Sequence, residues 1–301
     1  MNFFEKKFYR LYVNYLKNRQ GNDLKYLQAQ YYLKNSKKLD LDPPVEFMEK
    51  IQWLKLYKYT EQYGRYVDKH EVRDFVKKKV GEHVLNEELA VYNDVDEINL
   101  DELPNQFVLK CTHASGYNVI VKDKNALDWD KAKADLRRWM KTNYYHKSRE
   151  RVYKDVQPRI VAEKFLNELA DTSIIDYKFY CFHGKPEYVL VKLNENGRDY
   201  KCYYNMDWQK MVPEKENPGF LSREMPKPSN FYEMVDVAKK LSEGFIFMRV
   251  DLYSIAGRTL FGEMTFFPTG GIKRLFVERL NKEMGDLIQL PDVPQPQITQ
   301  N

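Results

Sequence analysis

Residues 248–266 read MRVDLYSIAGRTLFGEMTF and carry the clearest structural pattern in the chain. Two apolar runs flank a short turn that contains a glycine, which predicts a β-hairpin. Because side chains alternate between the two faces of a strand, Arg249 and Asp251 share one face, and Glu263 and Thr265 share one face of the partner strand. The register of such a hairpin can bring Asp251 opposite Glu263.

The two carboxylates of this hairpin have a chemical consequence. Carboxylates that share a site repel each other unless a cation lies between them. Mg²⁺ suits that position, since it takes oxygen ligands and usually binds substrate phosphates as well. Arg249 is suited to a phosphoryl or acyl-phosphate oxygen. The alternative interpretation is a salt-bridge cluster on the surface of the hairpin, and the apolar flanking residues favour the functional one.

Most of the second half of the chain is strand-like. Beside the hairpin, strands are predicted at 106–111, 118–123, 159–166, 176–193 and 201–206. Lys110 lies near the end of the first of these and precedes a small-residue turn, so it can point along a phosphate path. Helical patterns cover 128–147 and 229–242, where Asp128 and Ser229 are the expected N-caps. Strands that occur in blocks favour an α+β fold.

The first hundred residues have a mainly helical pattern. Residues 1–40 combine apolar residues at helical spacing, such as Phe4 and Phe8, with many lysines and arginines. A basic amphipathic helix of this kind packs on its own domain, which is the favoured interpretation, or lies on an anionic membrane surface. After an Asp-Pro-Pro break, a helix is expected over 68–80, and the acidic residues 88–105 are expected to form loops.

Composition narrows the functional classes. The 301 residues include 49 Lys and Arg against 44 Asp and Glu, a formal charge of +5 that is too dilute to indicate a nucleic-acid partner. Cys111, Cys181 and Cys202 show no metal-ligand spacing, which favours a reducing cytoplasm over a disulfide or zinc scaffold. No signal peptide and no run of about 20 apolar residues is present, so secretion and membrane spanning are not expected.

Taken together, these pieces resemble the ATP-grasp ligases, because they occur in the order typical of that family. The matching motifs are R-V-D at 249–251, E-M-T at 263–265, E-K-F-L at 163–166, D-Y-K at 176–178 and D-K at 68–69. The small-residue turn after Lys110 is similar to the lid of the family. More narrowly, residues 44–290 resemble the TupA-like branch, named for teichuronopeptide biosynthesis.

The resemblance implies an α+β ATP-grasp fold, with a lid subdomain that contains an antiparallel hairpin and a C-terminal antiparallel sheet with helices. The expected segments are a basic amphipathic helical segment at 1–43, a helical region at 44–104, the lid subdomain at 105–166, the C-terminal subdomain at 167–290 and a flexible tail at 291–301.

The resemblance also implies an ATP-binding set. Lys69 and Lys110 would contact the phosphates, and Asp176 would bind the ribose. The mobile lid over the phosphates would comprise Thr112, His113, Ser115 and Gly116, with Lys122 at the end of its second strand. The adenine would be held, mainly by backbone groups, at Glu163, Lys164, Phe165 and Leu166.

The same resemblance assigns the remaining roles. Lys178 would face the phosphates or the carboxylate substrate, Lys192 would face the substrate, and Arg249 would stabilise the acyl phosphate or the oxyanion. Mg²⁺ would be bound by Asp251, Glu263 and Thr265. The family usually has Asn at the third ligand position, so a metal ion at Thr265 is expected to be more weakly held or more solvated.

The implied activity is an ATP-dependent ligase that joins a carboxylate and an amine through an acyl phosphate, with ATP and Mg²⁺. Its branch accompanies bacterial surface-polysaccharide synthesis, such as capsule or O-antigen, so a uronic acid and an amino acid are the expected, sugar-linked substrates. The expected location is the cytoplasm, and attachment of the N-terminal helix to the inner face of the membrane is the alternative to its packing on its own domain. Three alternatives stay open: a kinase of the same fold, a non-catalytic binding module, and a nucleotide-sugar glycosyltransferase that would use the Asp94-Val95-Asp96 motif.

Overall fold

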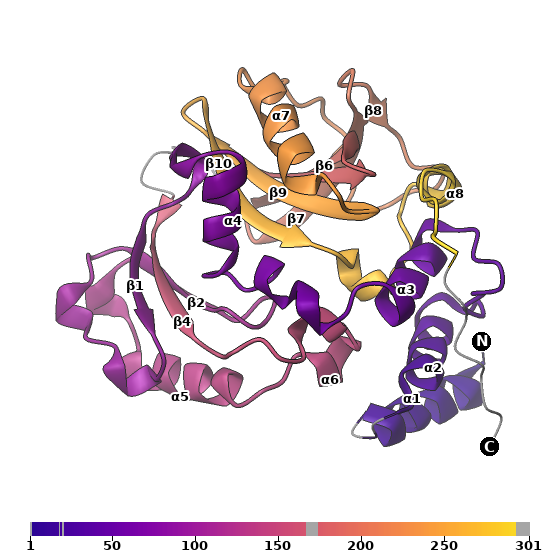
Figure 1. Ribbon diagram of the computed structural model, residues 1–301, viewed down its shortest axis with the longest axis horizontal. Helices are drawn as coiled ribbons and strands as arrows, with labels where there is room; N and C mark the ends of the chain where they lie inside the picture. Colours follow the sequence, from indigo (N-terminus) through magenta and orange to yellow (C-terminus); the bar gives the residue numbers. More distant parts are fainter. Residues whose placement is uncertain (1, 18, 20, 167–173, 293–301) are drawn as a thin grey trace.

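The computed structural model describes residues 2–17, 19, 21–166 and 174–292. The chain forms a four-stranded and a six-stranded β-sheet, both antiparallel, with helices around them (Figure 1). This is the expected α+β class. Most of the C-terminal tail expected at 291–301 lies outside the described residues.

The small sheet has the strand order β1-β4-β2-β3. Its strands are β1 Glu88–Tyr92, β2 Phe107–Cys111, β3 Asn118–Val121 and β4 Ile160–Lys164. Burial alternates along β2, so Phe107 and Leu109 share a core with Leu136 from helix α5 (Trp129–Met140). The same alternation leaves Lys110 on the opposite face of the sheet.

Strand β1 corrects one prediction from the sequence. Loops were expected over 88–105, but Glu88–Tyr92 pair with β4 through Ala90↔Ala162 and Val91↔Val161. The prediction is wrong because only one residue of β1 is fully buried, which leaves no apolar alternation to detect. Pairing with β4 supplies the strand conformation, so the small sheet includes a strand from the segment 44–104.

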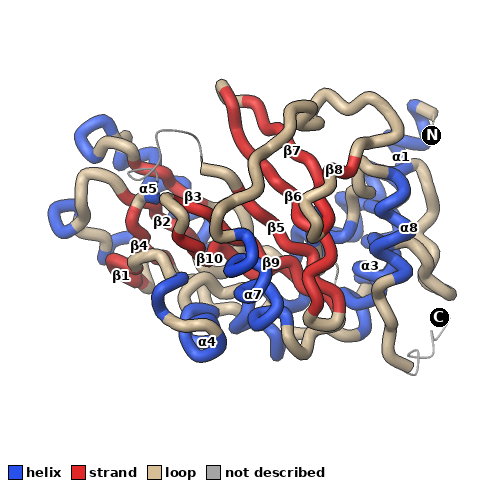
Figure 2. The backbone as a smooth tube through the Cα atoms, turned by 90° about the horizontal axis from the view of Figure 1, so that it is seen from above, coloured by secondary structure: helices blue, strands red, loops and turns tan. Residues whose placement is uncertain are grey.

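The large sheet has the order β10-β9-β5-β6-β7-β8. Its strands are β5 Asp176–Phe182, β6 Lys185–Glu195, β7 Arg198–Asn205, β8 Lys210–Met211, β9 Phe247–Ile255 and β10 Arg258–Thr265. On one face, Phe179, Val250 and Leu252 share a core with Met234 and Leu241 of helix α7 (Phe231–Ser242). The small sheet lies beside the β10 edge of this sheet (Figures 1 and 2).

The remaining helices form the N-terminal part of the chain or connect and flank the strands. They are α1 Phe3–Lys17, α2 Asp23–Asn35, α3 Phe47–Tyr57, α4 Val72–Lys79, α6 Tyr145–Ser148 and α8 Glu278–Asp286. Short 3₁₀ helices are η1 Glu61–Tyr66, η2 Glu82–Val84, η3 Val95–Glu97, η4 Leu100–Glu102, η5 Lys124–Ala126, η6 Arg151–Tyr153 and η8 Pro268–Gly271. Helices α1 and α2 lie at the end of the molecule away from the small sheet (Figure 1). None of the helices in the described ranges is long and apolar enough to cross a membrane.

Several helix boundaries differ from the predictions. The helix expected over 68–80 begins only at Val72, because Asp68 forms a turn ahead of it and accepts hydrogen bonds from the next backbone amides. The helix expected over 128–147 is interrupted between α5 and α6. The Asp128 cap is confirmed by its bond to the Lys131 amide. The Ser229 cap is wrong, since Asn230 holds that position.

Candidate functional site

A row of charged side chains crosses three strands of the large sheet, on the face opposite to the apolar one. Glu263 of β10 lies opposite Asp251 of β9, and Asp251 lies opposite Lys178 of β5. The Lys178 Nζ and Asp251 Oδ2 atoms are 2.5 Å apart. The hairpin expected from the sequence, with Asp251 and Glu263 as cross-strand neighbours, is therefore present.

This register depends on a β-bulge in β10. The first pairs of the hairpin follow a regular register that, if continued, would place Gly262 opposite Asp251 and turn Glu263 toward the apolar face. The extra residue at the bulge shifts the pairing by one position and returns Glu263 to the charged face. A Cβ atom at Gly262 would lie 3.0 Å from the Asp251 carbonyl oxygen, so the close strand approach favours glycine.

Arg249 lies between the two carboxylates. Its Nε and Nη2 atoms donate to the two oxygens of Asp251 at 2.6 and 2.8 Å. Its Nη2 also donates to Glu263 Oε1 at 2.9 Å and to the Thr265 hydroxyl at 3.0 Å. The guanidinium thus supplies the cation that two neighbouring carboxylates require.

The pKa shifts follow from this arrangement. Burial alone would raise the pKa of the Glu263 carboxyl, but Arg249, Lys178 and Lys69 hold it below its ordinary value. Burial alone would lower the pKa of the Lys178 ammonium, but Asp251 holds it above its ordinary value. Both side chains are therefore charged at neutral pH, whereas burial raises the pKa of the Asp251 carboxyl, with Arg249 and Lys178 opposing the shift.

A second row on the same face contains Asp176. It lies opposite Tyr253 of β9 on one side and Lys192 of β6 on the other. The Asp176 Oδ2 atom is 3.5 Å from Lys178 Nζ, and Lys192 pairs with Asp199 at 2.9 Å. Asp176 therefore faces the cavity beside the charged row.

The small sheet contributes an ion pair. The Lys110 ammonium donates to Glu163 Oε2 at 2.7 Å, from neighbouring strands β2 and β4. Burial alone would raise the pKa of Glu163, but Lys110 together with Arg73 and Asn86 holds it below its ordinary value. Glu163 thus fixes the position of the Lys110 ammonium at the sheet surface.

Lys69 is attached to the turn that follows β2. Its backbone amide donates to the Thr112 carbonyl at 3.4 Å, and its ammonium donates to the Ala114 carbonyl. The preceding Asp68 is buried and pairs with Arg159 at 3.1 Å, which fixes the chain ahead of α4. Lys69 is therefore held by the small sheet, although it precedes that sheet in sequence.

These groups line a cavity of about 360 Å³ between the two sheets. The predicted site residues that line it are Lys69, Lys110, Ser115, Gly116, Glu163, Asp176, Lys178, Lys192, Asp251 and Glu263. Arg249 and Thr265 reach the same cluster through their hydrogen bonds to Glu263. Motifs spread over almost 200 residues of sequence thus meet in one place.

The cavity also contains residues that the motifs did not indicate. They are Arg73, Asn86, Asn118, Tyr253, Phe261 and Gly262. The period-two pattern of β9 could have identified Tyr253, because it follows Asp251 by two residues. Asn118 lies opposite Lys110, a pairing that only the hairpin register reveals. Arg73 and Asn86 carried no signal in the sequence.

Other predicted ATP-site residues do not line this cavity. They are Thr112, His113, Lys122, Lys164, Phe165 and Leu166. The buried Thr112 hydroxyl bonds to the Gln157 carbonyl at 3.3 Å, and the His113 ring lies against the Trp139 carbonyl at 3.1 Å. Lys122 is exposed. The turn after β2 therefore contributes only Ser115 and Gly116 to the lining.

The hairpin carries oxygen ligands of the kind that Mg²⁺ prefers. Within the described ranges, no three His, Cys, Asp or Glu side chains are grouped so that they could hold a metal ion. Asp251 and Glu263 offer two carboxylates, and Thr265 adds a hydroxyl bonded to Glu263 at 3.0 Å. Mg²⁺ commonly binds one or two carboxylates and takes its other ligands from phosphates and water. The residues therefore fit a Mg²⁺ ion that arrives with a phosphate substrate.

Two antiparallel sheets with a charged cavity between them define the class: this is the ATP-grasp fold. The family model described as TupA-like ATPgrasp matches residues 49–289, which is most of the chain. The chain belongs to the TupA-like ATP-grasp family. No curated protein matches it.

Solved structures similar to this chain include three ATP-grasp proteins. The ligase PsnB, complexed with a minimal precursor, has 11% identity and a TM-score of 0.41, with 76% of this chain and 62% of that chain covered. D-alanine–D-alanine ligase from Helicobacter pylori has 13% identity and a TM-score of 0.43, with 75% and 61% covered. The Bacillus anthracis enzyme, complexed with ATP, has 14% identity and a TM-score of 0.46, with 74% and 65% covered. The chain thus spans somewhat less than two thirds of the length of these proteins.

Proposed function

We propose that this protein is an ATP-dependent ligase that joins a carboxylate to an amine as an amide. The observation that carries the proposal is the charged cavity between the sheets, where Lys69 and Lys110 face Lys178, Asp251 and Glu263. The Lys69 ammonium bonds to a carbonyl and the Lys110 ammonium to one carboxylate, so both can also bind the triphosphate of ATP. Two carboxylates beside them suit its Mg²⁺ ion, which would neutralise phosphate charge.

The proposed reaction has two steps. A carboxylate oxygen of the acid substrate attacks the γ-phosphorus of ATP, and the bond to the β,γ-bridging oxygen breaks, which gives an acyl phosphate and ADP. The neutral amine nitrogen then attacks the acyl carbon, and phosphate leaves with the bonding electron pair and one proton from the nitrogen. Arg249 and Lys178 would stabilise the negative charge on the acyl-phosphate oxygens, and the enclosed cavity would exclude water.

The position of Asp94 and Asp96 speaks against the glycosyltransferase alternative. Asp94 caps the short helix η3 through the Asp96 amide, and Asp96 forms salt bridges with Lys133 and Arg137 of α5. Neither carboxylate lines the cavity between the sheets. A metal-binding Asp-x-Asp motif would need its carboxylates free toward a substrate site.

An isotope experiment tests the proposed reaction. Glucuronate labelled with ¹⁸O in its carboxylate is incubated with Mg-ATP, mixed amino acids and the protein, and released phosphate is analysed by mass spectrometry. We expect one ¹⁸O atom in the phosphate and an amide product. ADP formed with the phosphate retained on the sugar would instead identify a kinase. Wild-type protein that neither binds Mg-ATP nor forms ADP contradicts both activities.

The biological setting is part of the proposal. We propose that the enzyme works in the cytoplasm, where ATP is available. Its acid substrate would be a sugar-linked uronic acid, as in capsule or O-antigen synthesis. The N-terminal helix supports attachment to the inner membrane face: Leu16 is buried, whereas Phe3, Phe4, Phe8 and Leu11 are between 60 and 81% exposed. Exposed aromatic residues with flanking lysines are typical of helices that lie in a bilayer interface.

A further inference from the structure

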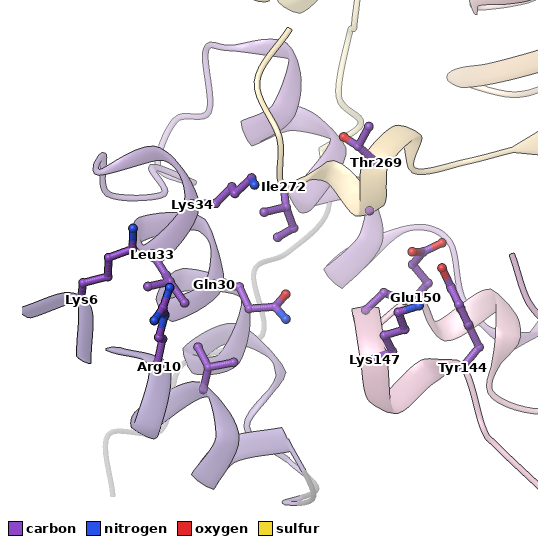
Figure 3. A pocket seen from close by; sticks show the side chains of 13 residues that line it. Lys6, Arg10, Gln30, Leu33, Lys34, Tyr144, Lys147, Glu150, Thr269 and Ile272 are labelled. Carbon is purple, nitrogen blue, oxygen red and sulfur yellow. The ribbon is translucent and has the colours of Figure 1, made fainter. Parts of the chain in front are cut away.

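A second cavity, of about 580 Å³, lies between the N-terminal helices and the segment around α6 (Figure 3). Its walls come from α1, α2, α6 and the turn η8. It shares no lining residue with the cavity between the sheets. It is a separate compartment that the proposed ATP site does not explain.

Positive charge predominates in this second cavity. Lys6 and Arg10 come from α1, Lys34 from α2 and Lys147 from α6. Within the described residues none of these four forms a salt bridge, whereas Lys37, just after α2, pairs with two carboxylates. Unbalanced cations around a concave surface attract anions. Lys6, Arg10 and Lys34 face Lys147 across the cavity (Figure 3).

One carboxylate interrupts this positive lining. Glu150 is buried, 7% exposed, and lies beside Tyr144 and Lys147 (Figure 3). It has no salt-bridge partner among the described residues. Burial raises the pKa of the Glu150 carboxyl, with Lys55 opposing the shift. A buried carboxylate that lines a cavity can hold an ammonium group and accept a proton from it.

The second cavity is connected to the charged cluster of the large sheet through the segment that follows β10. The lining residues Thr269 and Gly270 follow Thr265, the last residue of β10, by only a few positions. The Lys55 ammonium donates to the Gly270 carbonyl at 2.5 Å and to the Ser148 carbonyl at 3.0 Å, which ties η8 to α6.

Electrostatic effects agree with this proximity. Besides burial and Lys55, the charges of Glu263 and Arg249 affect the pKa of Glu150. Burial also raises the pKa of Tyr144 to about 12, with Glu150 and Glu263 adding to the shift and the Ser115 hydroxyl opposing it. Ser115 lines the cavity between the sheets and Tyr144 lines the second cavity, so Tyr144 lies between the two.

We propose that the second cavity binds the amine substrate, that this amine carries an anionic group, and that Glu150 receives its ammonium end. The inference rests on the proposed ligase function. The anionic group would lie among Arg10, Lys34 and Lys147. Glu150 takes one proton from the ammonium, and the resulting nitrogen lone pair forms the C–N bond as the acyl C–O bond breaks. The departing phosphate takes the second proton from the nitrogen, which leaves a neutral amide.

Calorimetry with O-phospho-L-serine tests the anion site, because this probe carries a phosphate, a carboxylate and an amine. The protein is first saturated with Mg-AMPPNP, so that the cavity between the sheets is filled. We expect saturable binding that weakens about tenfold or more in Arg10→Gln and in Lys147→Gln. Lys7→Gln, on the same helix but outside the lining, should bind as wild type. Equal binding by all variants overturns the proposal.

Two further ligands resolve the chemistry of the bound group. L-Glutamate in place of phosphoserine distinguishes a carboxylate-bearing amine from a phosphorylated one. 3-Phosphoglycerate has a hydroxyl where phosphoserine has its amine, so we expect it to bind wild type at least tenfold more weakly. In Glu150→Gln, phosphoserine and 3-phosphoglycerate should bind with equal affinity. Equal binding of both to the wild type contradicts the role of Glu150.

The same titrations separate this inference from the proposed function. Each variant is first titrated with Mg-AMPPNP alone, and we expect wild-type affinity in Arg10→Gln and Lys147→Gln. Failure of the wild type to bind the nucleotide contradicts the proposed function. Normal nucleotide binding without phosphoserine or glutamate binding contradicts only the second site. Lys147 is exposed, so its variant tests the site even where Glu150→Gln fails to fold.

Discussion

Glu263 and Asp251 lie directly opposite each other across the β9–β10 hairpin, and one guanidinium, that of Arg249, donates to both. The pair is therefore held together before any metal ion arrives. A divalent cation bound here, as we propose, would compete with Arg249 for the same oxygens and so would free Arg249 for a phosphate or acyl group.

We expect Glu263→Gln to lower Mg²⁺-dependent ADP formation by about 100-fold or more while the protein stays folded, because one of two metal-binding carboxylates is lost. Turnover is measured across a Mg²⁺ titration, with circular dichroism as the check on folding. The matched control is Glu216→Gln, at an exposed residue away from the cavity. Full activity in Glu263→Gln would refute the metal assignment.

We expect Gly262→Ala to destabilise the protein by about 1–3 kcal/mol, because the new methyl group would lie 3.0 Å from the Asp251 carbonyl and 3.1 Å from the Tyr253 ring. Urea denaturation measures the change. Activity should also fall, since relief of the clash moves Glu263 away from Asp251. Gly219→Ala is the comparison, because its φ lies outside the left-handed region and the atoms nearest to an added Cβ are 3.4 Å or more away. An unchanged activity at position 262 would show that the bulge is not required.

We expect Lys110→Ala to weaken Mg-ATP binding by about tenfold or more, since a hydrogen bond to a charged group contributes about 1.5–3 kcal/mol. Lys122→Ala should change the affinity by less than about twofold, because its side chain lies outside the cavity. Isothermal calorimetry compares the two. A larger loss in Lys122→Ala would favour the motif-based role of Lys122 over the geometry.

The Lys110–Glu163 pair predicts a stability difference that depends on pH. The folded-state pKa of Glu163 lies below its unfolded value, which is about 4.3. The stabilisation by Glu163 is therefore complete above that pH and is lost as the pH falls through the folded-state pKa. We expect the advantage of wild type over Glu163→Gln in thermal denaturation to be constant from pH 7 to about pH 5 and to shrink toward pH 3. A difference that persists unchanged at pH 3 argues against a charged Glu163.

We expect the double variant Phe4→Ser and Phe8→Ser to lower binding to phosphatidylglycerol vesicles by about tenfold or more, because burying one large apolar side chain contributes about 1.5–3 kcal/mol. Vesicle flotation measures the bound fraction. Tyr232→Ser is the control, since Tyr232 is 73% exposed but lies on α7. Equal flotation of all three proteins would remove the proposed role of α1.

The sequence predicted the parts of the site that depend on local patterns. Alternation along a strand was sufficient to place Arg249 with Asp251, and the motif order was sufficient to gather Lys69, Lys110 and Lys178. The bulge at Gly262 could not be predicted, because a regular hairpin of the same residues is equally compatible with the apolar pattern. From the sequence, the register that pairs Asp251 with Glu263 was therefore one possibility beside the regular register that pairs Asp251 with Gly262.

Other features depend on contacts that are distant in sequence. Strand β1 forms because β4 lies beside it, not because its own residues alternate. The lid turn was expected to present Thr112 and His113 to phosphates, yet both side chains are buried against backbone carbonyls. The second cavity joins residues near position 10 to residues near position 147, and no local pattern reports such a neighbourhood.

Because Lys69 is attached to the turn after β2, it belongs to the wall of the cavity that the small sheet forms, and the large sheet forms the opposite wall. The first wall contains Lys69, Lys110 and Glu163, and the second contains the Asp251 and Glu263 cluster. Within the described parts of the chain, each ion pair of the cavity joins two residues of the same wall. None of these ion pairs crosses the cavity, so a ligand that bound charged groups of both walls would join them directly. Outside the cavity, the Lys79–Glu243 pair at 2.6 Å already links α4 to the segment after α7.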